Sequence, residues 1–357
     1  MSDNNVDQTS PEQNNNAESR KKVKAVALLS GGLDSSLAVR IMLEQGVEVE
    51  AVAIKTPFCD FDCGKGCGHR VKEVASDLEI PLKTIYLGEE YLRMLKRPKF
   101  GFGSGMNPCI DCRSMMYNAA KEHMKKIDAD FIVTGEVLYQ RPMSQNNRAL
   151  DIIEKETDTQ GMVLRPLSAK ALPMTDIEKD GSVKRENLCN IVGRSRKGQL
   201  ALARKFGIDD PPNAAGGCLL TDPQFSTRIR DLMRHLDDPE KVPSINDVEL
   251  LKVGRHFRLS NVAKLIVGRD QNENYIMSSL VINDDIVIEA EEFPGPTCIL
   301  RSKNYEDSLV EKSSQIVLRY SDSPRGHESK VRVKYHGQVN VISAFPIGNG
   351  ELVSLRI

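Results

Sequence analysis

The chain lacks a net charge of either sign, and it lacks any long hydrophobic run. Its 357 residues include 49 basic and 50 acidic side chains, which gives a formal net charge of −1. The chain as a whole is therefore not a basic nucleic-acid coat, and any nucleic-acid surface must be local. No apolar stretch is long enough to span a bilayer, and the N-terminus has no signal-peptide pattern. We therefore expect a cytoplasmic protein with no membrane partner.

The N-terminus also lacks hydrophobic periodicity. Residues 1–22 are rich in Asn, Gln, Ser and Asp, so we expect a disordered tail there. The remaining chain is long enough for two or three domains with a sizeable core. In a cytoplasmic protein the eight cysteines are expected to be ligands, nucleophiles or core residues rather than disulfides.

Strand and helix patterns alternate from residue 24 to about residue 135. The expected strands are 25–29, 49–54, 82–86 and 131–134, and the expected helices are 35–45, 70–78 and 113–126. Short apolar strands between helices predict an α/β fold with a parallel sheet covered on both faces. Ligands of such sheets bind at the carboxyl ends of the strands. We expect residues 23–160 to form this nucleotide-binding domain.

The second half of the chain has different patterns. Residues 161–243 read as a mainly helical extension that completes the catalytic domain and ends in a linker at 237–243. Beyond it, strands are expected at 262–267, 275–280, 286–289, 297–300, 315–320, 330–335 and 338–344. Residues 244–357 are therefore predicted to form a smaller β-rich domain, and they contain no tandem repeat.

A glycine-rich turn joins the first expected strand to the first expected helix. Its sequence is Ser30-Gly31-Gly32-Leu33-Asp34-Ser35-Ser36. The glycines let the backbone approach a phosphate, while serine hydroxyls and the helix N-terminus supply donors. The Lys-Ser/Thr ending of a Walker A loop is missing. Asp34 is the best-placed ligand for Mg²⁺, and a helix-cap carboxylate is its alternative role.

Three cysteines form the second candidate site. Cys109 and Cys112 have the two-residue spacing of a metal knuckle ahead of a helix, which is expected to lower their pKa, and Cys218 is the best additional ligand. Three thiolates would leave one iron of a [4Fe–4S] cluster open. A zinc knuckle is one alternative. The other is a metal-free pair in which one cysteine carries a persulfide and another resolves it.

A further group of cysteines follows the second expected strand. Cys59, Cys63 and Cys67, followed by His69, lie within eleven residues, which is dense enough for a metal site. They could instead supply a thiol near the nucleotide, or be incidental residues of a glycine-rich loop. Cys189 and Cys298 are expected to be small buried hydrophobic residues.

Several segments together resemble one group of enzymes. The Ser30–Ser36 motif resembles the pyrophosphate loop (PP-loop) of ATP pyrophosphatases, which cleave ATP between the α and β phosphates. The segments 134–138, 144–146 and 163–167 are similar to those of the tRNA 4-thiouridine synthase family. Asn107-Pro108 with Cys112 resembles the segment of tRNA 2-thiouridylases in which that cysteine is catalytic, although Cys109 replaces the aspartate of that motif. The resemblance covers residues 23–225.

This resemblance implies an adenine-nucleotide alpha-hydrolase-like (PP-loop) fold and ATP-dependent thiolation of a tRNA uridine. It implies that the carbonyl oxygen is adenylated and that sulfur transfer then releases AMP, with Asp34, Cys109, Cys112 and Cys218 as catalytic residues. The Ser30–Ser36 loop would hold pyrophosphate, and Thr134, Gly135 and Glu136 would contact the nucleotide. Arg141 and Arg165 would steady phosphate or tRNA, or form structural ion pairs. The implied partners are tRNA, a sulfur donor (sulfide, a cysteine desulfurase or a sulfur carrier) and a second copy in a homodimer. A PP-loop enzyme acting on a small molecule and a non-catalytic RNA-binding iron–sulfur protein are the alternatives.

The C-terminal part has its own resemblance. Residues 254–258 and 266–274 resemble the small RNA-binding module at the end of NFACT proteins. This implies RNA contacts by nearby basic residues, which are Arg255, His256, Arg258, Lys264, Arg269, Lys330, Arg332 and Lys334. Such residues bind phosphates without reading sequence. An ordinary solvated surface is the alternative.

Overall fold

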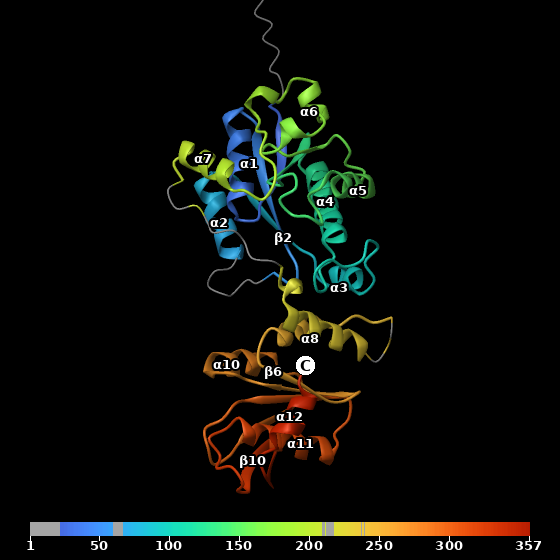
Figure 1. Ribbon diagram of the computed structural model, residues 1–357, viewed down its shortest axis with the longest axis vertical. Helices are drawn as coiled ribbons and strands as arrows, with labels where there is room; N and C mark the ends of the chain where they lie inside the picture. The colour runs from blue at the N-terminus through green and yellow to red at the C-terminus, as the bar shows by residue number, and fades with distance from the viewer. Residues whose placement is uncertain (1–21, 60–66, 209–210, 212–217, 237, 239) are drawn as a thin grey trace, which may run out of the picture.

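The structure, a computed structural model, describes residues 22–59, 67–208, 211, 218–236, 238 and 240–357. The expected tail at 1–22, apart from its last residue, and Cys63 lie outside the described residues, as does the side chain of Cys67. Figure 1 shows an α/β part and a β-rich part, with α8 (Pro223–Arg234) between them. Within the described ranges, no helix is both long and apolar enough to cross a membrane.

The α/β part contains a parallel sheet of five strands in the order β3-β2-β1-β4-β5. Their bounds are β1 Lys24–Leu28, β2 Glu48–Lys55, β3 Leu82–Tyr86, β4 Phe131–Thr134 and β5 Val163–Leu164. Successive strand residues point to opposite faces, and both faces are buried. Ala25 and Ala27 face one layer of helices, while Val26 faces the other. This is why the strands read as continuous apolar runs.

Helices cover both faces of the sheet. On one side lie α1 (Leu33–Glu44), α2 (Cys67–Asp77) and α7 (Lys197–Lys205), and on the other lie α4 (Cys109–Lys126) and α5 (Asn147–Thr157). The short elements are α3 Glu89–Lys96, η1 Ala169–Ala171, α6 Asp176–Lys179, η2 Arg185–Asn187 and η3 Leu219–Thr221. The predicted parallel α/β fold is therefore confirmed, and α3 and α5 are additions to it.

The β-rich part contains an antiparallel sheet in the order β11-β10-β8-β9-β7-β6. Its strands are β6 Arg255–Ser260, β7 Ala263–Val267, β8 Ile286–Ala290, β9 Cys298–Ser302, β10 Ser329–Tyr335 and β11 Gln338–Ala344. Helices α11 (Asp307–Arg319) and α12 (Asn349–Leu355) pack on one face, and α9 (Ile245–Leu251) and α10 (Gln271–Leu280) pack on the other. The predicted β-rich domain is confirmed.

Two strands predicted for this part are wrong. Residues 275–280 belong to α10, whose N-cap Asp270 accepts a hydrogen bond from the amide of Glu273. Residues 315–319 belong to α11, in which Leu309, Ser313 and Ile316 are buried at the spacing of a helix. In both places tertiary packing of a helical face outweighs the local β propensity of Ile and Val.

Candidate active site

A cavity of about 540 Å³ lies at the carboxyl ends of β1 and β4. These strands are neighbours at the point where the strand order reverses, with Leu28 paired to Thr134. Such a switch point is where open α/β sheets bind ligands. The lining includes most of the residues predicted for nucleotide contact, which are Ser30, Gly32, Leu33, Asp34, Ser35, Thr134, Gly135 and Glu136. Gly31 and Ser36 belong to the same turn without lining the cavity.

The serine side chains of the turn after β1 form hydrogen bonds within that turn. Gly31 has a φ of +73°, a backbone conformation that favours glycine. The hydroxyls of Ser35 and Ser36 each donate to the carbonyl of Gly32 over 3.0 Å. Ser30 Oγ lies 3.1 Å from Ser35 Oγ. The first turn of α1 therefore keeps a fixed shape below the cavity.

The end of β4 touches the start of α1 backbone to backbone. A Cβ atom at Gly135 would lie 2.4 Å from the amide nitrogen of Ser35, which no real side chain tolerates. Glycine at this position therefore lets the two segments meet and sets the width of the cavity.

Asp34 presents one unused acceptor. Its Oδ2 accepts a hydrogen bond from Gln140 Nε2 over 2.9 Å. Its Oδ1 is buried and has no hydrogen-bond partner among the described residues. A buried carboxylate oxygen is costly without a partner. Because carboxylate oxygens are the ligands that Mg²⁺ prefers, the residue fits the expected metal role.

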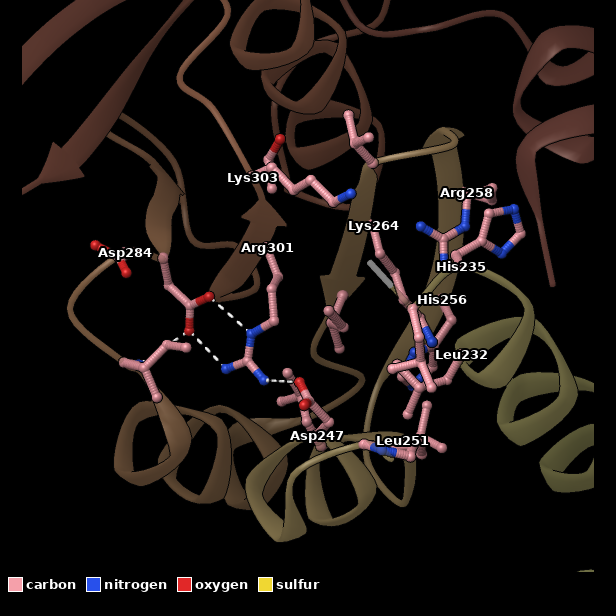
Figure 2. Close-up of a pocket in the computed structure, with 18 of the residues that line it drawn as sticks. Leu232, His235, Asp247, Leu251, His256, Arg258, Lys264, Asp284, Arg301 and Lys303 are labelled. Carbon is pink, nitrogen blue, oxygen red and sulfur yellow. Dashed lines mark hydrogen bonds and ion pairs between the residues drawn. The ribbon is translucent and has the colours of Figure 1, made fainter. Parts of the chain in front are cut away.

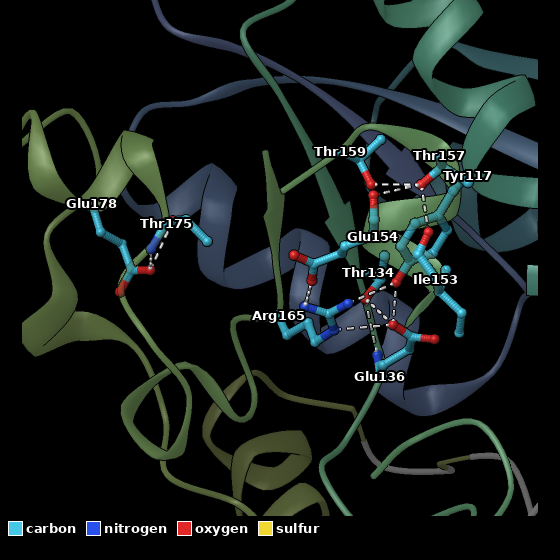
Figure 3. Close-up of polar contacts among 10 residues, drawn as sticks. All are labelled: Tyr117, Thr134, Glu136, Ile153, Glu154, Thr157, Thr159, Arg165, Thr175 and Glu178. Carbon is cyan, nitrogen blue, oxygen red and sulfur yellow. Dashed lines mark hydrogen bonds and ion pairs between the residues drawn. The ribbon is translucent and has the colours of Figure 1, made fainter. Parts of the chain in front are cut away.

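Glu136 is the centre of a buried network of polar contacts (Figure 3). It is buried, and its carboxylate lies 3.1 Å from Arg165 Nε and 3.4 Å from Arg113 Nε. It also accepts hydrogen bonds from the hydroxyls of Tyr117 and Thr134. Burial opposes ionisation, but Arg113 and Arg165 together lower the pKa of Glu136. The residue is therefore an ionised part of the cavity wall.

Arg165 forms a structural ion pair rather than a phosphate contact. Besides Glu136 it pairs with Glu154 over 2.7 Å, and only 5% of its side chain is exposed. The cavity instead contains four other arginines, which are Arg113, Arg141, Arg194 and Arg196, against the two carboxylates Asp34 and Glu136. This excess of positive charge suits a polyphosphate.

Gln140, Arg194 and Arg196 are lining residues that the sequence analysis missed. The two arginines come from the segment before α7 and carry no motif. An isolated bridge between Leu138 and Val192 brings that segment to the loop after β4.

The cysteines of the second candidate site gather next to, but outside, this cavity. Met106 N donates to Leu220 O over 2.9 Å, which joins the segment before α4 to η3 and brings Cys218 toward Cys109 and Cys112. Cys59, in the loop after β2, belongs to the same group, because a negative charge on Cys112, Cys59 or Cys109 would raise the pKa of the Cys218 thiol. The Tyr91 hydroxyl hydrogen-bonds to Cys112.

The thiols of Cys109, Cys112 and Cys218 are neutral at pH 7 in this arrangement. Burial raises the pKa of Cys109 and of Cys112, and it raises that of Cys218 to about 12. The prediction that the helix N-terminus lowers the thiol pKa is therefore wrong for this arrangement, since burial outweighs the nearby arginines.

Metal ligation by these cysteines does not fit the described residues. Across the described ranges, no three Cys, His, Asp or Glu side chains converge to hold a metal ion. The predicted set of Cys109, Cys112 and Cys218 is close together but not in ligand geometry. Of the second predicted set, only Cys59 has a described side chain, and its sulfur accepts from the Thr56 amide over 3.3 Å. Cys298 is buried in the apolar interior, as predicted, and Cys189 is partly buried against the core.

Most of the basic residues predicted to contact RNA face carboxylates. Lys334 pairs with Glu289 over 2.9 Å, Arg332 with Glu291 over 2.5 Å and Lys330 with Glu292 over 3.7 Å. Arg269 pairs with Glu273 and Arg258 with Asp231. Arg255 instead stacks 4.8 Å from the ring centre of Tyr320.

His256 and Lys264, the last two of the eight residues predicted to contact RNA, are buried. Their side chains point to the face of the sheet covered by α8 and α9, because β6 and β7 alternate between the two faces.

Comparison with known proteins assigns the two ends of the chain separately. Residues 21–178 match the family model described as thiamine biosynthesis protein (ThiI). Residues 254–354 match the model described as NFACT protein RNA binding domain. The tRNA-specific 2-thiouridylase MnmA of Natranaerobius thermophilus is 22% identical over 92% of this chain and 89% of its own. MnmA 2 of Clostridium botulinum is 30% identical over 39% of this chain and 40% of its own.

A solved structure, described as a 4-thiouridine synthetase–RNA complex with bound ATP, has a TM-score of 0.34 and 22% identity over 52% of each chain. The chain thus spans about half of that protein and less than half of the second relative. The two family matches confirm both resemblances seen in the sequence. Residues 21–178 are therefore similar to the ThiI family, and residues 254–354 are similar to the RNA-binding domain of NFACT proteins.

Proposed function

We propose that the protein is an ATP-dependent tRNA sulfurtransferase that thiolates a uridine. The observation that carries the proposal is the convergence of the Ser30–Ser36 loop and the end of β4 in one arginine-lined cavity, within the ThiI-family segment. The 2-thiouridylases among the relatives and the RNA-binding domain support tRNA as the acceptor. We expect the reaction to take place in the cytoplasm.

The first step activates the base. The uridine carbonyl oxygen attacks the α-phosphorus of ATP, the bond to pyrophosphate breaks, and the base becomes adenylated. The amides at the start of α1 and the Ser30–Ser36 loop receive the pyrophosphate, while Arg141 and Arg194 offset its charge. Bound Mg²⁺ supplies further positive charge to the phosphates. Asp34 is the residue that would hold it, through the unused Oδ1.

The second step transfers sulfur by thiol chemistry, since the described cysteines do not fit a cluster. Cys112 carries a persulfide received from the sulfur donor. Its terminal sulfur attacks the activated carbon, and AMP leaves. The Cys218 thiol then passes its proton to the released AMP, and its thiolate attacks the Cys112 sulfur. The S–S bond between Cys112 and the transferred sulfur breaks, and the base keeps that sulfur. The two cysteines finish as a disulfide, which an external thiol reduces.

The proposal is tested with purified protein, ATP and unmodified tRNA. We expect release of AMP and pyrophosphate that depends on tRNA, and a thiolated uridine once a persulfide donor is added. Mass spectrometry of the tRNA nucleosides identifies the product as 2-thiouridine or 4-thiouridine. AMP formation that is equal without tRNA would contradict the proposal and favour a small-molecule acceptor.

A further inference from the structure

A second cavity, of about 530 Å³, lies where α8 and α9 pack against the C-terminal sheet (Figure 2). One side is formed by β6, β7 and β9, which contribute Arg258, Lys264 and Arg301. The other side is formed by α8 and α9, which contribute Leu232 and Leu251. None of its lining residues lines the candidate active site, so it is a separate site.

Lys264 is a buried base without a matched partner. It is 7% exposed, and its Nζ has no hydrogen-bond partner in the part of the chain that the structure describes. Asp231 Oδ2 lies 3.9 Å away but already pairs with Arg258 over 2.5 Å. Burial, opposed by Asp231 and Asp247 and assisted by Arg258 and Arg228, lowers the pKa of Lys264 to about 7. An anion beside Nζ would supply the missing counter-charge.

His256 offers an acceptor in the same cavity. Its Nε2 lies 2.8 Å from the carbonyl of Val253, so this nitrogen carries the proton of the neutral ring. Burial, with Lys264 and Arg228 nearby, lowers the pKa of His256 well below its ordinary value. The other nitrogen, Nδ1, is buried and unpartnered among the described residues. A ligand here therefore needs both an anionic oxygen for Lys264 and a hydroxyl or N–H donor for His256.

The other charged side chains that line the cavity are mostly basic. Arg301 is paired with Asp247 over 2.6 Å and with Asp285 over 2.7 Å, as Figure 2 shows. The lining contains five basic side chains, Lys241, Arg258, Lys264, Arg301 and Lys303, against three carboxylates, Asp247, Asp284 and Asp285, and Asp231 beside the lining is the partner of Arg258.

The size of the cavity excludes a bare phosphate as a good fit, because pockets of this volume hold drug-sized ligands. Its apolar wall of Leu232, Val242, Leu251, Ile266 and Ile282 can cover a base. We propose that this cavity binds a nucleoside monophosphate unit, with its phosphate on Lys264 and a hydroxyl or amine on His256. The unit comes from a free mononucleotide or from one residue of an RNA strand. The site does not depend on the proposed thiolation.

Photo-crosslinking of the full chain tests this. The probes are 8-azido-AMP and a short RNA that contains 5-iodouridine, and labelled peptides are mapped by mass spectrometry. The variants are Lys264→Met and the control Lys252→Met, whose lysine pairs with Glu249 over 2.7 Å outside the cavity. We expect label on peptides within residues 223–303, reduced about tenfold in Lys264→Met and unchanged in Lys252→Met.

The two probes distinguish the sources. Label from 8-azido-AMP alone identifies a free mononucleotide. Label from the RNA that excess AMP removes identifies a residue of an RNA strand. Thermal melting checks that Lys264→Met folds, and label on the candidate active site serves as an internal control. Label confined to residues 22–208, or label at 223–303 that Lys264→Met leaves unchanged, would overturn the proposal.

Discussion

Gln140 Nε2 donates a hydrogen bond to Asp34 Oδ2 over 2.9 Å and thereby joins the loop after β4 to the first turn of α1. The bond fixes one oxygen of the carboxylate and leaves the other, Oδ1, directed at no protein donor among the described residues. Asp34 is thus oriented before any ligand arrives. Such preorganisation is what an electrostatic site requires.

Replacing Asp34 tests the activation step. We expect Asp34→Asn to keep the bond to Gln140 by rotation of the amide and to lower tRNA-dependent pyrophosphate release by about 100-fold, because the metal loses a charged ligand. Stopped assays of labelled pyrophosphate measure this. Gln140→Ala is the comparison, and a smaller loss of roughly tenfold is expected because only orientation is removed. Equal activity of Asp34→Asn and the unmodified protein would exclude Asp34 from the mechanism.

Replacing Glu136 tests the buried ion-pair network. Glu136→Gln leaves Arg113 and Arg165 without their shared carboxylate, so we expect a loss of about 3–5 kcal/mol in the free energy of unfolding. The matched control is Glu89→Gln, whose exposed pair with Arg93 is worth less than about 1 kcal/mol. Urea denaturation measures both.

The contribution of Glu136 to the free energy of unfolding should decrease as the pH falls. Its folded pKa is lower than the ordinary value of 4.5, so its stabilising effect is present above that pH and is lost as the pH falls below it. The difference in unfolding free energy between the unmodified protein and Glu136→Gln should therefore shrink in acid. A difference that is constant with pH would contradict the assignment of Glu136 as ionised.

Lys264 is expected to destabilise the folded protein most at low pH, whereas Glu136 stabilises it least there. Its folded pKa of about 7 lies below the ordinary 10.5, so the unfolded chain binds more protons between these values and stability rises with pH there. We expect Lys264→Met to lack this rise and to be more stable than the unmodified protein by roughly 1–3 kcal/mol at pH 7 and below. Denaturant titrations at several pH values measure it. A Lys264→Met variant that is less stable at pH 7 would contradict an uncompensated buried charge.

The ion pairs along β10 predict how RNA affinity responds to charge. Arg332 already faces Glu291, so Arg332→Ala should change RNA affinity little. Glu291→Gln frees the guanidinium, and we expect tighter RNA binding and a salt dependence steeper by about one released counterion. Fluorescence anisotropy with labelled tRNA over a range of salt concentrations measures both. Unchanged affinity and salt dependence in Glu291→Gln would show that RNA does not contact this strand.

Much of the candidate site is predictable from local sequence, because the strand, the glycine turn and the helix that form it are adjacent in the chain. Gln140 and Arg194 are not predictable in this way, since only tertiary contacts bring their loops to the cavity. Residues 315–319 show a second limit of prediction from local sequence, which concerns secondary structure. Ile316 and Val317 favour a strand by themselves, and only the buried face of α11 makes them helical. His256 and Lys264 look like surface bases until α8 and α9 cover them.

Gly135 and Ser35 belong to motifs that are distant in the sequence, but their main chains are in contact. The two positions therefore cannot vary independently. The atoms that meet are main-chain atoms, so no choice of side chain at position 35 can make room for a larger residue at position 135. A Cβ at 135 would have to push the first turn of α1 away from β4, and Asp34 would move with it. Natural variation in this protein should therefore keep glycine at 135 even where the serines of the loop change.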